Sequence, residues 1–251
     1  MASPGLELND AILLLAILQA NVAQITADRA LHVRYAALDA LPEDSLRRPI
    51  SVSALAASLG LPFETVRRRL ARLAKIGICE ATRRGYHIPG DVLRRPQFAN
   101  APAVIHDMVQ TLAKVLAEAG CQAPMAPAPG PPRPRIAARL ATDYFLRMLT
   151  LMVDRTDDPV DAFLLLALFD TTPNPATVTE VARRFGMTHE TARRRLWALE
   201  SRGFCARVHK GWILPPAGLA ALRFEEALEE NISHLRLMFS GLVRFGVLVP
   251  A

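Results

Sequence analysis

Apolar residues recur at helical spacing along most of the chain, and a few short alternating stretches interrupt them. Leucines, alanines and methionines three and four positions apart predict helices with a buried face. We expect helices at 8–25, 27–41, 53–59, 62–76, 103–118, 137–153, 159–169 and 216–243. The alternating stretches predict short strands at 78–82, 86–88, 204–208 and 212–214. The chain is therefore expected to be mainly α, with two small β-hairpins.

One segment of this pattern occurs twice. Residues 50–89 align with residues 176–215 without a gap, at a constant offset of 126. Both copies contain A-x-x-x-G, then E-T-x-R-R-R-L-x-x-L-x-x-x-G, and finally a glycine–aromatic pair and a proline. Self-similarity at a fixed offset indicates a duplicated structural unit. Each copy is expected to form a helix, a tight turn, a second helix with three arginines, and a basic hairpin.

The second helix of each copy has one apolar face. Helical geometry places Val66, Leu70 and Leu73 in one narrow sector, which must face the core. In the second copy the inward residues are Ala192, Leu196 and Leu199. The outward positions are Glu64, Arg68 and Arg72, with Arg67 and Arg69 on the flanks, and Glu190, Arg193, Arg194 and Arg195 in the second copy. A charged face is thus opposed to a core face in both helices.

A helix with this outward face fits the major groove of DNA. Arginine bonds guanine bidentately there, glutamate accepts from cytosine, and residues near the helix N-terminus reach the bases first. We expect base reading by Phe63, Glu64, Arg67, Arg68, His189, Glu190, Arg193 and Arg194. We expect phosphate contacts, including those of the hairpin tips, by Thr65, Arg69, Arg72, Arg83, Arg84, Thr191, Arg195, His209 and Lys210. The partner is then double-stranded DNA.

Both copies resemble the winged helix-turn-helix superfamily, and the string from glycine through E-T-x-x-R is similar to the DNA-binding domain of cyclic-AMP receptor and Fnr regulators. The resemblance implies base reading by Glu64, Arg68, Glu190 and Arg194, and phosphate contacts by Thr65 and Thr191. Nothing in the chain is similar to their cyclic-nucleotide domain. Pro62 also stands where Thr188 supplies a helix-capping hydroxyl, so the first recognition helix is expected to begin differently.

Composition divides the chain into an N-terminal helical unit (1–120), a proline-rich linker (121–135) and a C-terminal helical unit (136–251). Each unit is expected to hold one winged helix-turn-helix between packing helices. Prolines in the linker deny helix continuity and favour an extended spacer. The net charge of +6 is modest, but arginines concentrate in the two repeats. Local concentration matters more to a polyanion than the net charge does.

The sequence indicates no cofactor and no metal site. Its three cysteines form no C-x-x-C pair, and Cys79 and Cys205 are expected to be buried packing residues. No catalytic motif is present, so no enzymatic activity is expected. No signal peptide or membrane-spanning stretch is evident, which favours a cytoplasmic, nucleoid-associated protein. A homodimer through the flanking helices and a small-molecule effector are left open.

We interpret the chain as a sequence-specific transcription regulator that reads two half-sites with tandem winged helices. Two alternatives remain open at this point. One is a replication-initiator-like or chromosome-organising protein, because tandem winged helices occur in such proteins too. The other is a protein-interaction scaffold without DNA binding, in which the outward arginines are only solvated surface.

Overall fold

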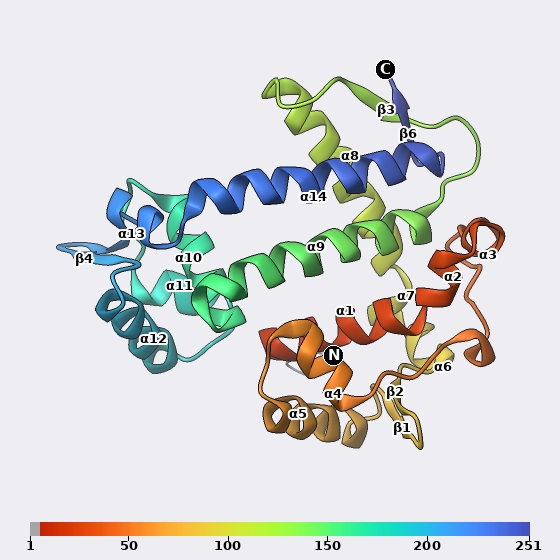
Figure 1. Cartoon of the computed structure of the whole chain (residues 1–251), viewed down its shortest axis with the longest axis horizontal. Helices are drawn as coiled ribbons and strands as arrows, with labels where there is room; N and C mark the ends of the chain where they lie inside the picture. The colour runs from red at the N-terminus through yellow and green to blue at the C-terminus, as the bar shows by residue number, and fades with distance from the viewer. Residues whose placement is uncertain (1–5) are drawn as a thin grey trace. The chain divides into compact units, whose positions relative to one another are not determined.

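The computed structural model describes residues 6–251 and is mainly helical, with short strand pairs (Figure 1). The longer helices are α1 (Leu8–Asn21), α5 (Phe63–Lys75), α8 (Ala101–Glu118), α9 (Pro134–Thr156), α10 (Pro159–Thr171), α12 (His189–Ser201) and α14 (Phe224–Arg244). The shorter ones are α2 (Ala23–Ala27), α3 (Arg29–Arg34), η1 (Asp44–Leu46), α4 (Val52–Leu59), α6 (Gly90–Leu93), α7 (Pro96–Ala99), α11 (Val178–Arg184) and α13 (Pro216–Ala221). The strands are β1 (Glu80–Thr82), β2 (Gly85–His87), β3 (Met125–Pro127), β4 (Ala206–Val208), β5 (Gly211–Ile213) and β6 (Leu248–Pro250). The expected fold class, mainly α with small β-wings, is confirmed.

The described chain forms two compact units that are interleaved along the sequence. Unit 1 takes residues 6–12, Ser58–Leu61 and Met148–Ile232, and unit 2 takes Leu13–Ala57, Pro62–Arg147 and Ser233–Ala251. This differs from the expected consecutive division, because α1, α9 and α14 each contribute residues to both units. The second repeat lies in unit 1 and the first repeat, apart from residues 58–61, lies in unit 2.

Unit 1 is built around the second repeat. Its core joins α10, α11, α12 and the β4–β5 hairpin, with Leu164, Leu168, Leu196 and Leu199 fully buried and Trp212 2% exposed. α11 begins with a capping box, in which the Thr177 hydroxyl and the Glu180 carboxylate each accept from the other residue's backbone N–H. The hairpin and α12 pack on the same apolar cluster as α10 and α11.

Unit 2 holds the first repeat and a separate helical layer. Val66, Leu70 and Leu73 of α5 are fully buried. The helical layer packs α8, the first turns of α9 and the last turns of α14 around Ile136 and Leu242, both fully buried. Each repeat is thus attached to long helices that the recognition motif itself does not contain.

The segment expected to be an extended linker takes part in the fold of unit 2. β3 pairs antiparallel with β6 at the C-terminus, with Met125 opposite Pro250. The Arg133 guanidinium donates to the Phe245 carbonyl at 2.5 Å, and Arg135 already lies in the first turn of α9. The prolines do prevent a helix over 121–133, as expected, but strand pairing holds that stretch in place.

Three expected helices are shortened or divided in the structure. The helix expected at 8–25 ends at Asn21, and the helix expected at 27–41 is only α3, which starts where the Asp28 carboxylate accepts from the N–H groups of Ala30 and Leu31. The helix expected at 216–243 is divided into α13 and α14 by Arg223, whose φ is 48°. Apolar periodicity continues through such breaks and does not reveal them.

Both hairpins extend to a third strand position. Ile50 bridges Tyr86 and Ala176 bridges Trp212, each with two backbone hydrogen bonds of 2.8–2.9 Å. The glycine preceding each aromatic residue has a positive φ, 128° at Gly85 and 154° at Gly211. A Cβ atom would lie 2.2 Å from the Ile50 carbonyl oxygen at Gly85 and 2.4 Å from that of Ala176 at Gly211. The glycine of the repeated pair is therefore required by a close backbone contact as well as by the turn.

A helix that lies outside the aligned repeat supports each hairpin. In unit 2 the Ile88 N–H donates to the Asn21 side chain at the end of α1, at 3.0 Å. In unit 1 the Leu214 N–H donates to the Thr172 hydroxyl at the end of α10, at 3.2 Å. Ile88 and Leu214 are related by the 126-residue offset, whereas Asn21 and Thr172 are not. The first repeat thus has α2, α3 and η1 inserted between its supporting helix and α4.

We predict that Gly211→Ala destabilises the protein by about 2 kcal/mol or more beyond Gly203→Ala, measured as the free energy of unfolding in urea. Both glycines have positive φ, but a Cβ at Gly203 meets nothing within 4 Å. The pair therefore compares a positive-φ glycine whose Cβ position is open with one whose Cβ would overlap Ala176. Equal destabilisation would show that the bridge to Ala176 is not part of the folded hairpin.

Candidate DNA-binding surface

Helix α12 of unit 1 is oriented by its cap and its buried face. The Thr188 hydroxyl accepts from the Thr191 N–H at 3.2 Å, which confirms the expected cap. Ala192, Leu196 and Leu199 are fully buried, so the predicted inward face is confirmed. The opposite face of the first turns is solvent-exposed.

The exposed face of α12 carries a glutamate–arginine fork. Glu190 accepts from Arg193 Nε at 2.9 Å and from Nη2 at 2.7 Å, one turn apart on the same side of the helix. This hydrogen bonding holds the pKa of Glu190 below its ordinary value. Because both side chains are exposed, the pair adds little stability. Its effect is to order two side chains that are both expected to reach bases.

Helix α5 of unit 2 repeats this arrangement with a different beginning. Pro62 precedes it and makes no side-chain cap, as the sequence predicted. Glu64 accepts from Arg67 Nε at 2.8 Å and from Nη2 at 2.5 Å. Hydrogen bonding by Arg67 likewise lowers the pKa of Glu64. The two recognition helices therefore present the same fork at equivalent positions.

One arginine on each helix is left unpaired. Arg68 and Arg194 are exposed and form no hydrogen bond or ion pair within residues 6–251. Each follows the arginine of the fork directly in sequence. A guanidinium that is solvated and unengaged has all five donors available to a ligand. His189 and Phe63, both exposed, stand one position before the fork glutamates.

The third arginine of each run does not lie on the outward face. Arg195 is half-buried, and its Nη1 contacts Asp158 at 2.9 Å and Asp161 at 2.6 Å. The expectation of an outward Arg195 is therefore corrected, because the helical turn directs it to the cap and first turn of α10. Burial raises the pKa of Asp161 although Arg195 opposes the shift. Arg69, at the equivalent position, is also half-buried.

The remaining expected residues are placed as follows. Arg72, Arg83, Arg84, His209 and Lys210 are exposed, the last four at the hairpin turns, whereas Thr65 and Thr191 are half-buried. The Thr191 side chain accepts from the Thr188 hydroxyl at 2.8 Å. The phosphate roles of these residues stay predictions. Cys79 and Cys205 are buried as expected, and burial raises the pKa of their thiols to about 11 and about 12.

The sequence interpretation missed a contact between the second hairpin and α12. The Arg207 guanidinium lies 4.9 Å from the ring centre of Trp197, which packs edge-on against Trp212 at 5.7 Å. The backbone N–H of Arg207 also donates to the Glu200 carboxylate at 3.1 Å. An exposed tryptophan at an outward helix position was the available signal. Arg207 thereby joins the basic residues of the hairpin in a fixed orientation.

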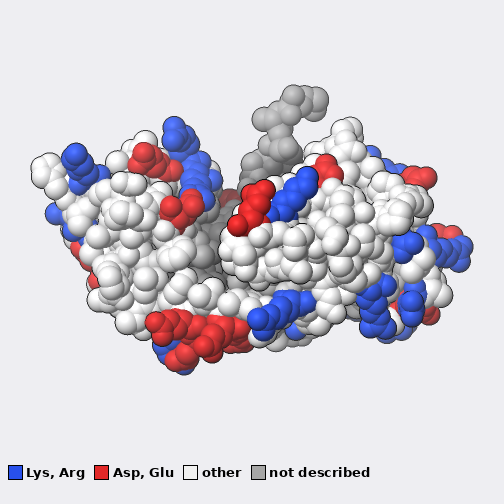
Figure 2. All heavy atoms as spheres, turned by 90° about the horizontal axis from the view of Figure 1, so that it is seen from above, with Lys and Arg blue, Asp and Glu red and all other residues white. Residues whose placement is uncertain are grey.

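Charges of both signs occur on the face of the molecule that Figure 2 shows. On the face shown in Figure 2, blue Lys and Arg side chains alternate with red Asp and Glu groups and large white areas. The position of a few exposed arginines on a groove-sized helix is the relevant feature.

Comparison with known proteins supports this interpretation for the second repeat. The family model described as the IclR helix-turn-helix domain matches residues 162–209, which run from α10 through α11 and α12 into the hairpin. None of the curated proteins matches the chain. The chain is a DNA-binding transcription regulator of the bacterial winged helix-turn-helix class.

Two further observations concern other classes of function. No helix within residues 6–251 is long and apolar enough to span a bilayer. Across the same residues, no three His, Cys, Asp or Glu side chains come close enough together to hold a metal ion. The Asp-rich loop after α9 is instead engaged by Arg195 and by Arg202, which contacts Asp157 at 2.8 Å.

We predict opposite phenotypes for two adjacent arginines of α12. Arg195→Ala leaves Asp158 and Asp161 without their counter-charge and should destabilise the protein by about 1–3 kcal/mol in urea unfolding. Arg194→Ala removes an exposed, unpaired side chain and should change the unfolding free energy by no more than about 0.5 kcal/mol. Comparable destabilisation by both changes would contradict the assignment of inward and outward arginines.

Proposed function

We propose that both repeats bind DNA and that one chain reads two half-sites, so that the chain is its own pseudo-dimer. In this proposal the two winged helix-turn-helix units arose by duplication and retain a similarity to cyclic-AMP receptor and Fnr regulators. The observation that carries it is the recurrence of one arrangement on α5 and α12: an exposed fork followed directly by an unpaired arginine. The two alternatives differ from this proposal in different ways. A replication-initiator-like or chromosome-organising protein would bind DNA at other positions in the genome, and a protein-interaction scaffold would not bind DNA.

Side-chain chemistry supports base reading by the first turns of each helix. Arg68 and Arg194 have free donors for the guanine O6 and N7 acceptors. The fork glutamates are ionised and already oriented, so they are suited to accept from a cytosine amino group. Their arginines can turn from the glutamate to a base or phosphate at little cost, because an exposed pair is weak.

The two half-sites need not be identical in this proposal. Phe63 is 51% exposed at the beginning of α5, where α12 has His189. An apolar ring at that position favours contact with a thymine methyl group, whereas imidazole can hydrogen-bond a base edge or a phosphate. Arg72 is likewise replaced by Ala198 in the second repeat. An asymmetric operator is therefore expected.

We predict that Arg68→Ala and Arg194→Ala each weaken binding to the specific site by about 1–3 kcal/mol and relax the base preference in one half-site only. The site is first identified by mapping bound fragments across the genome, and affinities are then measured at fixed salt on that sequence. Sites at promoters support regulation, whereas repeated sites beside a replication origin would favour the initiator alternative.

The matched control is Arg29→Ala, which removes an exposed arginine outside both repeats. The full chain is used throughout, since unit 2 draws on both halves of the sequence and cutting the chain would disrupt it. If only one of the two recognition-helix variants loses affinity, the other repeat is not a DNA reader. Loss of neither would favour the interaction scaffold.

A second prediction concerns the hairpin tips. Arg83, Arg84 and Lys210 are exposed on turns that offer no rigid frame for reading bases. Replacing all three with neutral residues should weaken binding to specific and to non-specific DNA by a similar factor. The slope of log K against log salt should fall by about 0.9 for each lost phosphate contact. An unchanged slope would show that these hairpin residues do not contact DNA phosphates.

A further inference from the structure

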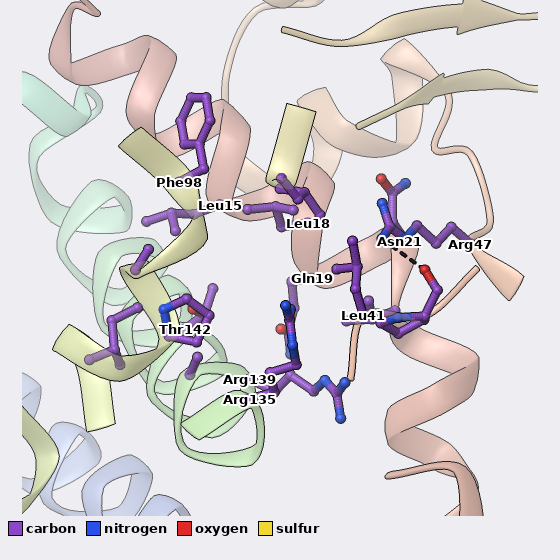
Figure 3. Close-up of a pocket in the computed structure, with 17 residues that line it drawn as sticks. Leu15, Leu18, Gln19, Asn21, Leu41, Arg47, Phe98, Arg135, Arg139 and Thr142 are labelled. Atoms are coloured by element: carbon purple, nitrogen blue, oxygen red, sulfur yellow. Dashed lines mark hydrogen bonds between the residues drawn. The ribbon is translucent and has the colours of Figure 1, made fainter. Parts of the chain in front are cut away.

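Unit 2 contains a cavity of about 150 Å³ that no part of the proposed DNA interface uses (Figure 3). Its walls come from α1, from the segment that precedes α4, from α6 and α7, and from α8 and the first turns of α9. Most of the lining is apolar and includes Leu15, Leu18, Leu41, Phe98 and Ile105. The cavity therefore lies beside the helix that supports the first hairpin.

Three arginines line the cavity, and none of its lining residues is acidic. Arg47 and Arg139 are 5% and 7% exposed, and Arg135 is half-buried. Figure 3 shows Arg135 and Arg139 together at one end of the cavity in this view, away from Phe98 and Leu15. Arg135 and Arg139 thus form a basic end of the cavity, Phe98 and Leu15 lie at an apolar end, and Arg47 lies apart from both beside Asn21.

The arginines at the basic end are bonded only to neutral groups. Arg139 donates to the carbonyls of His32 and Tyr35, at 3.3 and 2.9 Å, and Arg135 donates twice to the Leu38 carbonyl. Within residues 6–251 neither forms an ion pair. These bonds hold the chain after α3, and they use only part of the five donors of each guanidinium. The remaining donors form no ion pair, although the Asp39 carboxylate lies near enough to Arg135 to oppose part of the lowering of its pKa.

Buried cations without a counter-charge are unfavourable unless an anion joins them. Burial, and after it the neighbouring Arg135, lowers the pKa of Arg139 to about 10. Burial and the nearby Arg47 also lower the pKa of Arg135. An anion placed between them would relieve both the desolvation and the mutual repulsion.

The volume of the whole cavity limits the size of the ligand that carries the anionic group. A cavity of this volume lined by Leu, Ile and Phe is large enough for a six-carbon hydrocarbon such as benzene. Four of the five apolar residues named above are leucine or isoleucine, which adapt to a flexible chain. The cavity is thus suited to a small molecule with one anionic group and a short apolar body.

We propose that this cavity binds a short-chain aliphatic carboxylate of about six carbons, with the carboxylate between Arg135 and Arg139 and the chain against the leucines of α1. The binding site itself does not depend on the proposed reading of two half-sites. Its use as a regulatory site does rest on DNA binding by the first repeat.

Two residues connect the cavity to the first hairpin. Arg47 lines the cavity and donates to the Ile88 carbonyl at 2.8 Å, directly after β2. Asn21 also lines it and accepts from the Ile88 N–H at 3.0 Å, while its amide donates to the Arg48 carbonyl at 2.8 Å. A ligand that shifts α1 or Arg47 therefore acts on both hydrogen-bonding groups of Ile88. A ligand alters DNA affinity only as far as it binds the free and DNA-bound states differently.

Calorimetric titration of the full chain with hexanoate, without DNA, tests the binding site. We expect saturable binding with one site and a Kd of roughly 0.01–1 mM, the range open to a ligand of this size. Three control ligands are titrated in the same way. Hexanol has the hydrocarbon chain without the negative charge, acetate has the charge without the longer hydrocarbon chain, and hexylamine has the opposite charge. Each should bind at least about tenfold more weakly. If hexanoate does not bind, or if hexanol binds equally well, the proposal is wrong. The two arginines would then serve only to hydrogen-bond the backbone carbonyls in and after α3.

Two variants locate the ligand. Arg139→Gln removes one guanidinium and should weaken hexanoate at least about tenfold while leaving hexanol unchanged. Ala138→Phe fills the cavity without altering either arginine and should abolish binding of both, which keeps the test valid if Arg139→Gln fails to fold. Arg29→Gln, an exposed arginine on α3, should bind hexanoate like the wild type. Unchanged hexanoate affinity in folded Ala138→Phe places the ligand elsewhere.

The regulatory arm is measured separately on the mapped operator. A hexanoate-dependent change in DNA affinity that is several-fold in the wild type and absent in Ala138→Phe supports coupling through Arg47 and Asn21. If hexanoate binds but the DNA affinity does not change, the coupling between the cavity and DNA binding is refuted, while the binding site itself is supported. Hexanoate binding by a chain that binds no DNA refutes the proposed function and not the site.

Discussion

Burial of one face of the recognition helix is the constraint on which the rest of the structure depends. Leu70 and Leu73 in α5, and Leu196 and Leu199 in α12, are completely withdrawn from solvent. Once that face is fixed, the direction of every other side chain on the helix follows from helical geometry. The same burial brings each hairpin against its helix, so the helix and the basic hairpin are held as one element.

Arginine serves three different physical purposes in this chain. Arg68 and Arg194 are solvated and available, whereas Arg195, next in sequence to Arg194, is bound by two carboxylates within the fold of unit 1. Arg139 is buried against carbonyl groups at the edge of a cavity. Adjacent arginines differ because a helix turns by about 100° per residue. Surroundings, not residue type, decide which guanidinium can meet DNA, which stabilises the fold and which can meet a small anion.

The hairpins show how backbone contacts can require a residue more strictly than a turn does. Gly85 and Gly211 leave room for the carbonyls of Ile50 and Ala176, and the following aromatic residue pairs with the same strand. The hydrogen bond from Ile88 to Asn21, and that from Leu214 to Thr172, then attach each hairpin to a helix outside the repeat. Through this attachment a shift of the flanking helix reaches the hairpin.

Sequence alone determined the local part of this protein: the recognition helices, their inward leucines, the cap at Thr188, the hairpins and the outward Glu–Arg pairs. These depend on periodicity and on neighbours three or four residues away, which a single sequence displays. Only the tertiary structure decided where Arg195 points, that 121–135 contains a paired strand, and that α1 rather than an aligned segment supports the first hairpin. It also brought Arg47, Arg135 and Arg139 to one cavity. Those features join residues tens of positions apart, and their partners are set by packing that leaves no periodic trace in the sequence.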